Sequence, residues 1–115
     1  MAADRMRRVD EAVRQVLSDA VAQDLQDPRI GFVTMMSVKT TQDLRHARVY
    51  VSVLGDEAQR AASLAGLSSA HGALQRRLAR ELRMKRTPTL EFLYDDTTDR
   101  AMAIERLLER DTGDA

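Results

Sequence analysis

Apolar residues recur every three or four positions over the first part of the chain, a spacing typical of an amphipathic helix. Most residues between them are polar, and the pattern predicts a helix from about Asp4 to Asp24. The apolar positions on which this prediction rests are Val9, Val13, Val16, Leu17, Ala20 and Leu25. Pro28 follows, and because proline cannot continue a helix and disfavours helix in the residue before it, we expect the helix to end before it.

The pattern changes to one typical of strands after Gly31. Residues 32–38 are rich in strand-forming residues, and residues 46–53 alternate strictly between apolar and polar side chains. Such alternation predicts a strand with one covered face and one solvent-exposed face. The covered face would consist of Ala47, Val49, Val51 and Val53. The short polar segment 40–43 predicts a turn, so we expect the two strands to form an antiparallel hairpin.

Two helices are predicted in the middle of the chain. The first opens near residues 55–57, and one of its sides is apolar: Ala58, Ala61, Leu64 and Ala65. Residues 68–72 are weak helix formers and interrupt it. The second helix then continues to about Met84. Its apolar stripe has the spacing i, i+4, i+8 and consists of Leu74, Leu78 and Leu82.

A third strand and a last helix are predicted to complete the chain. Residues 89–94 read as the strand, and Asp95-Asp96-Thr97-Thr98 offers capping side chains for a short final helix. The apolar stripe of that helix consists of Ala101, Ile104, Leu107 and Leu108. We expect residues 111–115 to form a frayed tail and residues 1–110 to form a single domain.

The order of these elements predicts an α+β fold. A strand–helix–helix–strand connection favours parallel strands joined by a right-handed crossover. The hairpin adds an antiparallel pair. We therefore expect a three-stranded mixed sheet with the second strand in the centre and helices on one face, which is a two-layer sandwich.

Composition narrows the possible chemistry. Hydrophobic residues make up 43% of the chain and charged residues 31%, as in folded globular domains. The chain has no cysteine, which excludes disulfides and cysteine-based metal sites. No apolar run is long enough to span a bilayer, and the first residues lack the apolar stretch of a signal peptide, so we expect a cytoplasmic protein. His46 and His71 have no partner at metal-ligand spacing, and no glycine-rich phosphate-binding loop is present. We expect no enzymatic activity, no metal and no cofactor.

Charge is segregated along the chain although the formal net charge is +0. Residues 76–86 contain six basic residues and one acid, whereas residues 91–115 contain eight acids and three arginines. The attraction of an anionic partner depends on such local clusters rather than on the total. At helical spacing, Arg76, Arg80 and Arg83 share the side opposite the leucine stripe, with Arg77 at its flank.

This basic segment is the strongest candidate for a phosphate-binding surface. Arginine binds phosphate with a planar fork of donors, and the start of the helix would offer free backbone N–H groups. Two Tyr, two Phe and no Trp are too few for a base-stacking platform. The predicted contacts are Arg76, Arg77, Arg80, Arg83, Lys85 and Arg86, with Lys39, Arg45 and Arg48 of the hairpin as second choices. A merely solvated helix face is the alternative for any single charged helix.

The order of elements is similar to that of the type II KH fold, an RNA-binding domain. The Gly-x-x-Gly loop of KH domains is absent, and Ala70-His71-Gly72 stands in its place. Four strings resemble the ribosome-binding factor A family, a bacterial family of small-subunit assembly factors. They are RRVDE at residues 7–11, DPRIGFVT at 27–34, DLRHARVYVSV at 43–53 and PTLEF at 88–92. They occur in the family's order over about residues 5–110.

The resemblance implies a non-catalytic factor that binds the free small ribosomal subunit around the 5′-terminal helix of its ribosomal RNA. It also implies a role in late maturation and 5′-end processing of that RNA, above all in the cold. In this family an Ala-x-Gly kink replaces the KH loop, which corresponds to Ala70, His71 and Gly72. We hypothesise that Gly72 is required for a positive φ or for close helix packing.

We expect a monomer that has no membrane partner. Two other functions stay open from the sequence: a protein–protein interaction module whose basic helix docks on an acidic partner, and a small RNA-processing enzyme. A steep loss of RNA affinity with salt would favour RNA binding over the first, and a turnover assay on precursor ribosomal RNA would reveal the second.

Overall fold

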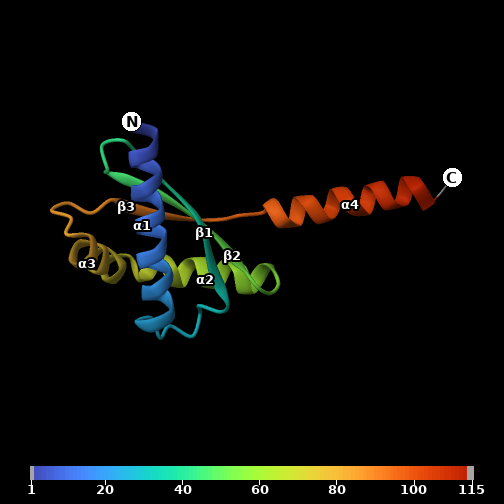
Figure 1. Cartoon of the computed structure of the whole chain (residues 1–115). Coiled ribbons are helices and arrows are strands. Elements are labelled where there is room, and N and C mark those ends of the chain that lie inside the picture. Colours follow the sequence, from blue (N-terminus) through green and yellow to red (C-terminus); the bar gives the residue numbers. More distant parts are fainter. Residues whose placement is uncertain (1, 114–115) are drawn as a thin grey trace.

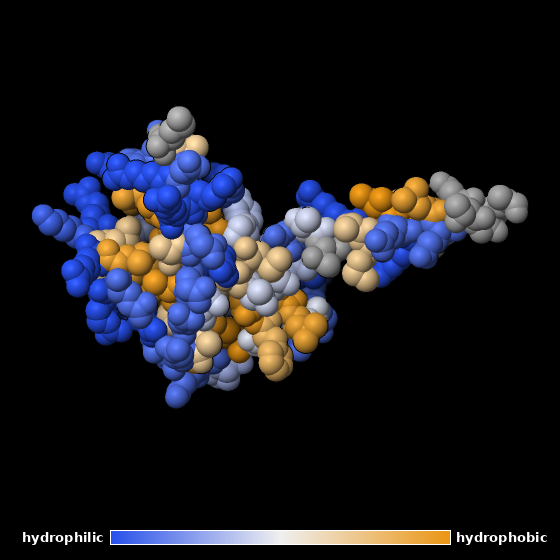
Figure 2. All heavy atoms as spheres, viewed as in Figure 1, coloured by the Kyte–Doolittle hydropathy of each residue, from blue (hydrophilic) through white to orange (hydrophobic). Residues whose placement is uncertain are grey.

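The computed structural model describes residues 2–113 and contains the predicted elements in the predicted order. They form a packed body from which the last helix projects (Figure 1; Figure 2). The elements are α1 (Ala2–Gln23), β1 (Val33–Thr40), β2 (His46–Val53), α2 (Glu57–Ser69), α3 (His71–Leu82), β3 (Thr89–Tyr94) and α4 (Thr97–Gly113). None of the helices within these residues has the length and apolar character needed to cross a membrane.

The sheet has the predicted mixed topology, with β2 in the centre. β1 pairs with β2 in the antiparallel sense and β3 pairs with β2 in the parallel sense. A register shift between Met35 and Ser37 interrupts β1. This irregularity lets Met35 and Val38, three positions apart, both lie buried, which strict alternation would not allow.

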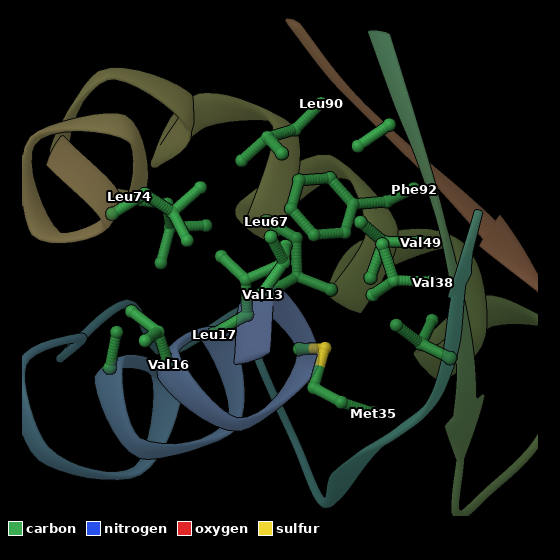
Figure 3. Packing of buried hydrophobic residues seen from close by; sticks show 14 of the residues in the cluster. Val13, Val16, Leu17, Met35, Val38, Val49, Leu67, Leu74, Leu90 and Phe92 are labelled. Atoms are coloured by element: carbon green, nitrogen blue, oxygen red, sulfur yellow. The ribbon is translucent and has the colours of Figure 1, made fainter. Parts of the chain in front are cut away.

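One face of the sheet packs against α1, α2 and α3 and forms the hydrophobic core (Figure 3). The inward side chains of β2 are buried as the alternation predicts. They meet Val13 and Leu17 of α1, Leu67 of α2, and Leu74 and Leu78 of α3. The leucine stripe of α3 is confirmed, since Leu82 also packs against this cluster.

The buried side of α2 differs from the predicted one. Ala58, Ala61 and Ala65 are exposed and Leu64 is partly buried. The buried residues are Ser63, Gly66 and Leu67. The Ser63 hydroxyl accepts the Gly31 N–H at 3.1 Å, and a Cβ on Gly66 would lie 2.6 Å from Ile30 Cγ1. The prediction was wrong because α2 packs against the loop before β1, a contact that requires small residues rather than an apolar stripe.

The chain bends at Ala70, between α2 and α3. Ala70 has φ −86° and ψ 7°, and the next residue already belongs to α3. His71 Nε2 accepts the Leu90 N–H at 3.0 Å, so this histidine ties α3 to β3. The hypothesis about Gly72 is wrong: its φ is not positive, and a Cβ there would meet only Arg76 Nη1, at 3.5 Å. Neither backbone strain nor close packing requires glycine at this position.

α4 extends away from the body instead of joining the helix layer (Figure 1). The helix is longer than predicted: it starts at Thr97, whose N–H donates to Asp95 Oδ1 as the capping prediction implies, and it continues to Gly113. It therefore includes residues 111–113, where the sequence predicted fraying; residues 114–115 lie outside the described part of the chain. Ile104 and Leu107 of its predicted apolar stripe are 57% and 60% exposed. The amphipathic pattern is present, but the stripe is not covered by the body.

Candidate nucleic-acid interface

Arginines occupy the solvent-facing side of α3. Arg76 and Arg80 are exposed on the side of the helix opposite the buried leucines, and we call this pair the α3 patch. α3 contains one acidic residue, Glu81, and Arg77 forms an ion pair with its carboxylate. Because that carboxylate is engaged elsewhere, the α3 patch can attract an anion without competition from its own helix.

Arg77 lies in a different environment from the α3 patch. Its side chain is only 12% exposed, and its Nη1 lies 2.5 Å from Asp24 Oδ2. Its Nη2 donates to Gln23 Oε1 at 2.9 Å, and its Nε donates to Glu81. The hydrogen bonds with Glu81 and then Asp24 raise the pKa of Arg77. The guanidinium joins α3 to the end of α1, so Arg77, which was predicted at the flank of the arginine side and as a phosphate contact, is not part of the exposed α3 patch.

The end of α3 places three more cations next to the sheet. Arg83 adopts a left-handed conformation with φ 52° and ψ 42°, and its N–H donates back into the helix. This conformation ends the helix and turns the chain, so Lys85 and Arg86 lie in the loop that leads to β3. All three side chains are exposed. Gln75 holds the loop, because its Nε2 donates to Pro88 O at 2.9 Å.

The hairpin contributes cations at one end of the sheet. Lys39 of β1 lies directly opposite Arg48 of β2, and both are exposed. Like charges directly opposite each other on paired strands repel. Arg48 Nε lies 3.9 Å from Glu91 of β3, which is too far for a hydrogen bond. Together with His46 and Thr89, these residues line a hollow of about 560 Å³. An anion in this hollow would relieve the repulsion between the two cations.

The topology brings the hairpin and the loop after α3 to the same end of the molecule (Figure 1). Because β3 is parallel to β2, its first residue, Thr89, pairs with His46, and the Thr89 N–H donates to Arg45 O at 2.8 Å. Arg45 is exposed, with Asp43 at 3.9 Å. Two groups of cations that are far apart in the sequence therefore lie together. We call this surface the basic end: Lys39, Arg45, Arg48, Arg83, Lys85 and Arg86.

Arg7 of α1 is exposed beside the basic end but is not among the contacts predicted from the sequence. It lines a hollow of about 290 Å³ with Lys39, between α1 and the edge strand β1. Asp10 in the same hollow accepts the Thr40 N–H at 2.9 Å, which places this part of α1 against the end of β1. The excess of arginine over acid in residues 1–9 is the sequence feature that points to Arg7. The position of α1 along β1 is not visible in the sequence.

The other end of the sheet is acidic. Asp95 caps α4, and Asp96 Oδ2 lies 2.9 Å from Arg100 Nε. α4 itself carries Asp99 and Glu105. β3 thus begins among cations and ends among carboxylates, and the segregated charges of the sequence become opposite ends of the molecule. Such a polarised molecule attracts and orients a polyanion even when its net charge is zero.

The comparisons with known proteins agree on one family. The family model described as "Ribosome-binding factor A" matches residues 5–108. A relative from Halorhodospira halophila with the same name is 45% identical over 106 residues, which cover 91% of this chain and 84% of the relative.

Solved structures with this name share the fold. The crystal structure of ribosome-binding factor A from Thermus thermophilus matches with a TM-score of 0.69 and 32% identity, over 77% of this chain and 93% of the other. A homology model of the Thermus thermophilus factor, fitted into a cryo-EM map of a 30S complex with it, matches with a TM-score of 0.63 and 34% identity. That match covers 75% of this chain and 90% of the other. The fold is the KH-like α+β fold of these structures.

Proposed function

The chain belongs to the ribosome-binding factor A family, and we propose on that ground that it binds the free small ribosomal subunit. It would act in the cytoplasm, as a monomer and without catalysis. The relative that was fitted into a map of a 30S complex supports this proposal, because the two chains are 34% identical and share a fold. The protein would therefore use its surface chemistry, rather than a reaction centre, to act on the subunit.

The observation that carries the proposal is the basic end together with the α3 patch. Both consist of exposed cations, and the fold gathers them from a hairpin, a helix and a loop. We propose that these cations bind phosphates of the small-subunit ribosomal RNA near its 5′-terminal helix. Binding there would assist late maturation and 5′-end processing of the RNA. The need for it would be greatest in the cold.

The proposal can be tested through the salt dependence of binding. Replacing Arg80 and Arg83 with Gln removes two exposed charges. Gln is a good helix former at position 80, and at position 83 it replaces one exposed non-glycine residue with another, so the fold should survive. Affinity for isolated small subunits should fall. The slope of log affinity against log salt should flatten by about one to two units. With two fewer phosphate contacts, binding releases fewer counterions from the RNA.

The matched control removes two arginines from the other end of the molecule. Arg100→Gln with Arg106→Gln on α4 changes the net charge by the same amount, and both side chains are exposed. This variant should bind with a slope close to that of the parent protein. If the two variants change the slope equally, or if the α4 variant alone changes it, the RNA-binding surface has been placed at the wrong end.

A further inference from the structure

α4 is an amphipathic helix whose apolar side, with Ile104 and Leu107, is exposed in the part of the chain that the structure describes. Ala101, Ile104 and Leu107 fall on one side of it at helical spacing, and Glu105 flanks them. Figure 2 shows hydrophobic side chains along the projecting helix. A helix with an apolar stripe normally buries it against another surface. The stripe therefore points to a second position of α4, or to a partner, that the extended arrangement does not show.

The open face of the sheet, which is the face opposite α1, α2 and α3, also carries apolar side chains. At its centre Tyr50 of β2 pairs with Leu93 of β3, and both side chains are half-buried and directed away from the core. At the end near α4, Phe32 and Leu54 are largely exposed. They line a hollow of about 460 Å³ whose other side is formed by Arg60, Tyr94 and Asp99 at the base of the extended α4. At the other end lies the hollow of the basic end. The open face is thus apolar near the base of α4 and positively charged far from it.

We propose that the open face of the sheet is the docking surface for the chain's own α4. α4 leaves the body at the end of β3, so a reversal at residues 95–96 would bring it back along the open face. Its 17 residues span about 25 Å, slightly more than the roughly 20 Å of the six residues of β3. In that position Ala101 and Ile104 lie nearest Tyr50 and Leu93, and the carboxyl-terminal half of α4, with Glu105 and Leu107, reaches the basic end.

The size of the stripe favours the same chain over a second copy. A stable interface between separate proteins usually buries at least about 1,200 Å² in total. Three or four side chains on one helix fall well short of that area. Within one chain, a small interface suffices, because the short connection to β3 keeps α4 at a high effective concentration near the sheet.

Three residues at the base of α4 hold the extended position. The Arg60 guanidinium of α2 lies 3.7 Å from the centre of the Tyr94 ring and 3.5 Å from Asp99 Oδ2. The Tyr94 hydroxyl donates to the same Asp99 oxygen at 2.6 Å. Among the described residues, the buried Arg60 Nε has no hydrogen-bond partner, which weakens the arrangement. The extended and docked positions of α4 therefore compete, and the hydroxyl of Tyr94 favours the extended one.

Docking has a functional consequence that rests on the proposed RNA binding. α4 in the docked position covers the hollow with Lys39 and Arg48, and its carboxylates take the place of RNA phosphates there. The docked form therefore binds the small subunit less well than the extended form. Apparent affinity then falls in proportion to the fraction of molecules that are extended.

A distance measurement on the isolated full chain tests the docking. The chain has no cysteine, so Gln42→Cys in the hairpin turn and Ala103→Cys on α4 can carry a pair of spin labels. We expect two distances: a long one for the extended helix and a much shorter one for the docked helix. Adding Tyr94→Phe should enlarge the short-distance population. Ile104→Gln with Leu107→Gln should abolish it, whereas Met102→Gln, on the opposite side of α4, should leave it unchanged.

The proposal is wrong if the parent protein and the Tyr94→Phe variant both show only the long distance. It is equally wrong if the short distance survives in the Ile104→Gln, Leu107→Gln variant. Neither result depends on ribosomes, so a failure here is distinct from a failure of the proposed function. In the binding assay, the unlabelled Ile104→Gln, Leu107→Gln variant should bind small subunits more tightly than the parent protein. The expected factor is the reciprocal of the fraction of parent molecules in which α4 is extended. An unchanged affinity despite a measured docked population would contradict the proposal that docking of α4 weakens binding to the small subunit.

Discussion

Two glycines on neighbouring helices show how differently the same residue can be constrained. A Cβ on Gly66 would lie 2.6 Å from Ile30 Cγ1, a distance that real side chains do not tolerate. A Cβ on Gly72 would meet only the flexible end of Arg76, at an ordinary contact distance. Gly66 is therefore required by the packing of α2 on the loop before β1, whereas Gly72 costs α3 some helix propensity without a packing benefit.

Substituting each glycine with alanine should give opposite effects on stability. Gly66→Ala should lower the free energy of unfolding by on the order of 1–3 kcal/mol, because Ile30 and its loop must move. Gly72→Ala should raise it by about 0.5 kcal/mol through better helix propensity. Urea unfolding of the two variants and the parent protein measures both values. A destabilised Gly72→Ala would restore the idea that the bend after Ala70 needs glycine.

Arg77 and Arg80 are a second pair that sequence spacing does not distinguish. Arg77→Ala leaves Asp24 and Glu81 without their partner, and we expect it to lower the free energy of unfolding by more than Arg80→Ala does. Arg80→Ala, at an exposed position, should change it by less than about 0.5 kcal/mol. Urea unfolding measures these values. In the small-subunit binding assay, Arg80→Ala should lose more affinity than Arg77→Ala. Equal losses of stability would mean that Arg77 does not join the two helices.

The residues of the candidate site could be predicted only in part. Helical periodicity correctly places Arg76 and Arg80 on the exposed side of α3, since the leucine stripe fixes the buried side. It cannot show that Arg77 meets Asp24, because that contact joins residues 53 positions apart. The same limit explains why Arg7 was not predicted as part of the site, since its place beside Lys39 depends on how α1 lies against β1. The phosphate contacts themselves stay predictions.

At the level of elements, the strength of each pattern decided how well it could be interpreted. β2 alternates without exception, and β3 begins and ends at the predicted residues. α2 consists largely of small residues, so its pattern contained little information about the buried side. α4 has a clear stripe, but an amphipathic pattern says that a helix needs a partner and does not say which one. The extended position of α4 could not be predicted for that reason.

The central strand provides the sharpest test of the sheet. Val51 has no exposed surface and lies in β2, between both neighbouring strands. Val51→Asp would bury a charge without a partner and should cost more than about 4 kcal/mol, enough to unfold the domain. Ser52→Asp, the next residue on the open face, should leave the protein folded. Far-UV circular dichroism and sedimentation velocity distinguish these results, and a folded, monomeric Val51→Asp variant would contradict the architecture.

At the level of the whole molecule, the fold converts a sequence pattern of charge into a spatial one. Cations from β1, β2 and the loop after α3 gather at one end of the sheet, and carboxylates gather around the start of α4. The parallel pairing of β2 with β3 produces this separation, because β3 carries the chain from the basic end to the acidic one. The separate basic and acidic segments were visible in the sequence. Which end of the molecule each would occupy could be known only from the topology.

This polarity predicts binding to a generic polyanion despite a net charge of +0. The protein should be retained on immobilised heparin at pH 7 and low salt, because the basic end can face the resin while the acidic end faces away. Lys39→Gln with Arg48→Gln should elute at clearly lower salt. Arg100→Gln with Arg106→Gln removes the same charge from α4 and should elute close to the parent protein. If both variants shift equally, retention follows net charge rather than its distribution, and the basic end has no separate role in attracting an anionic partner.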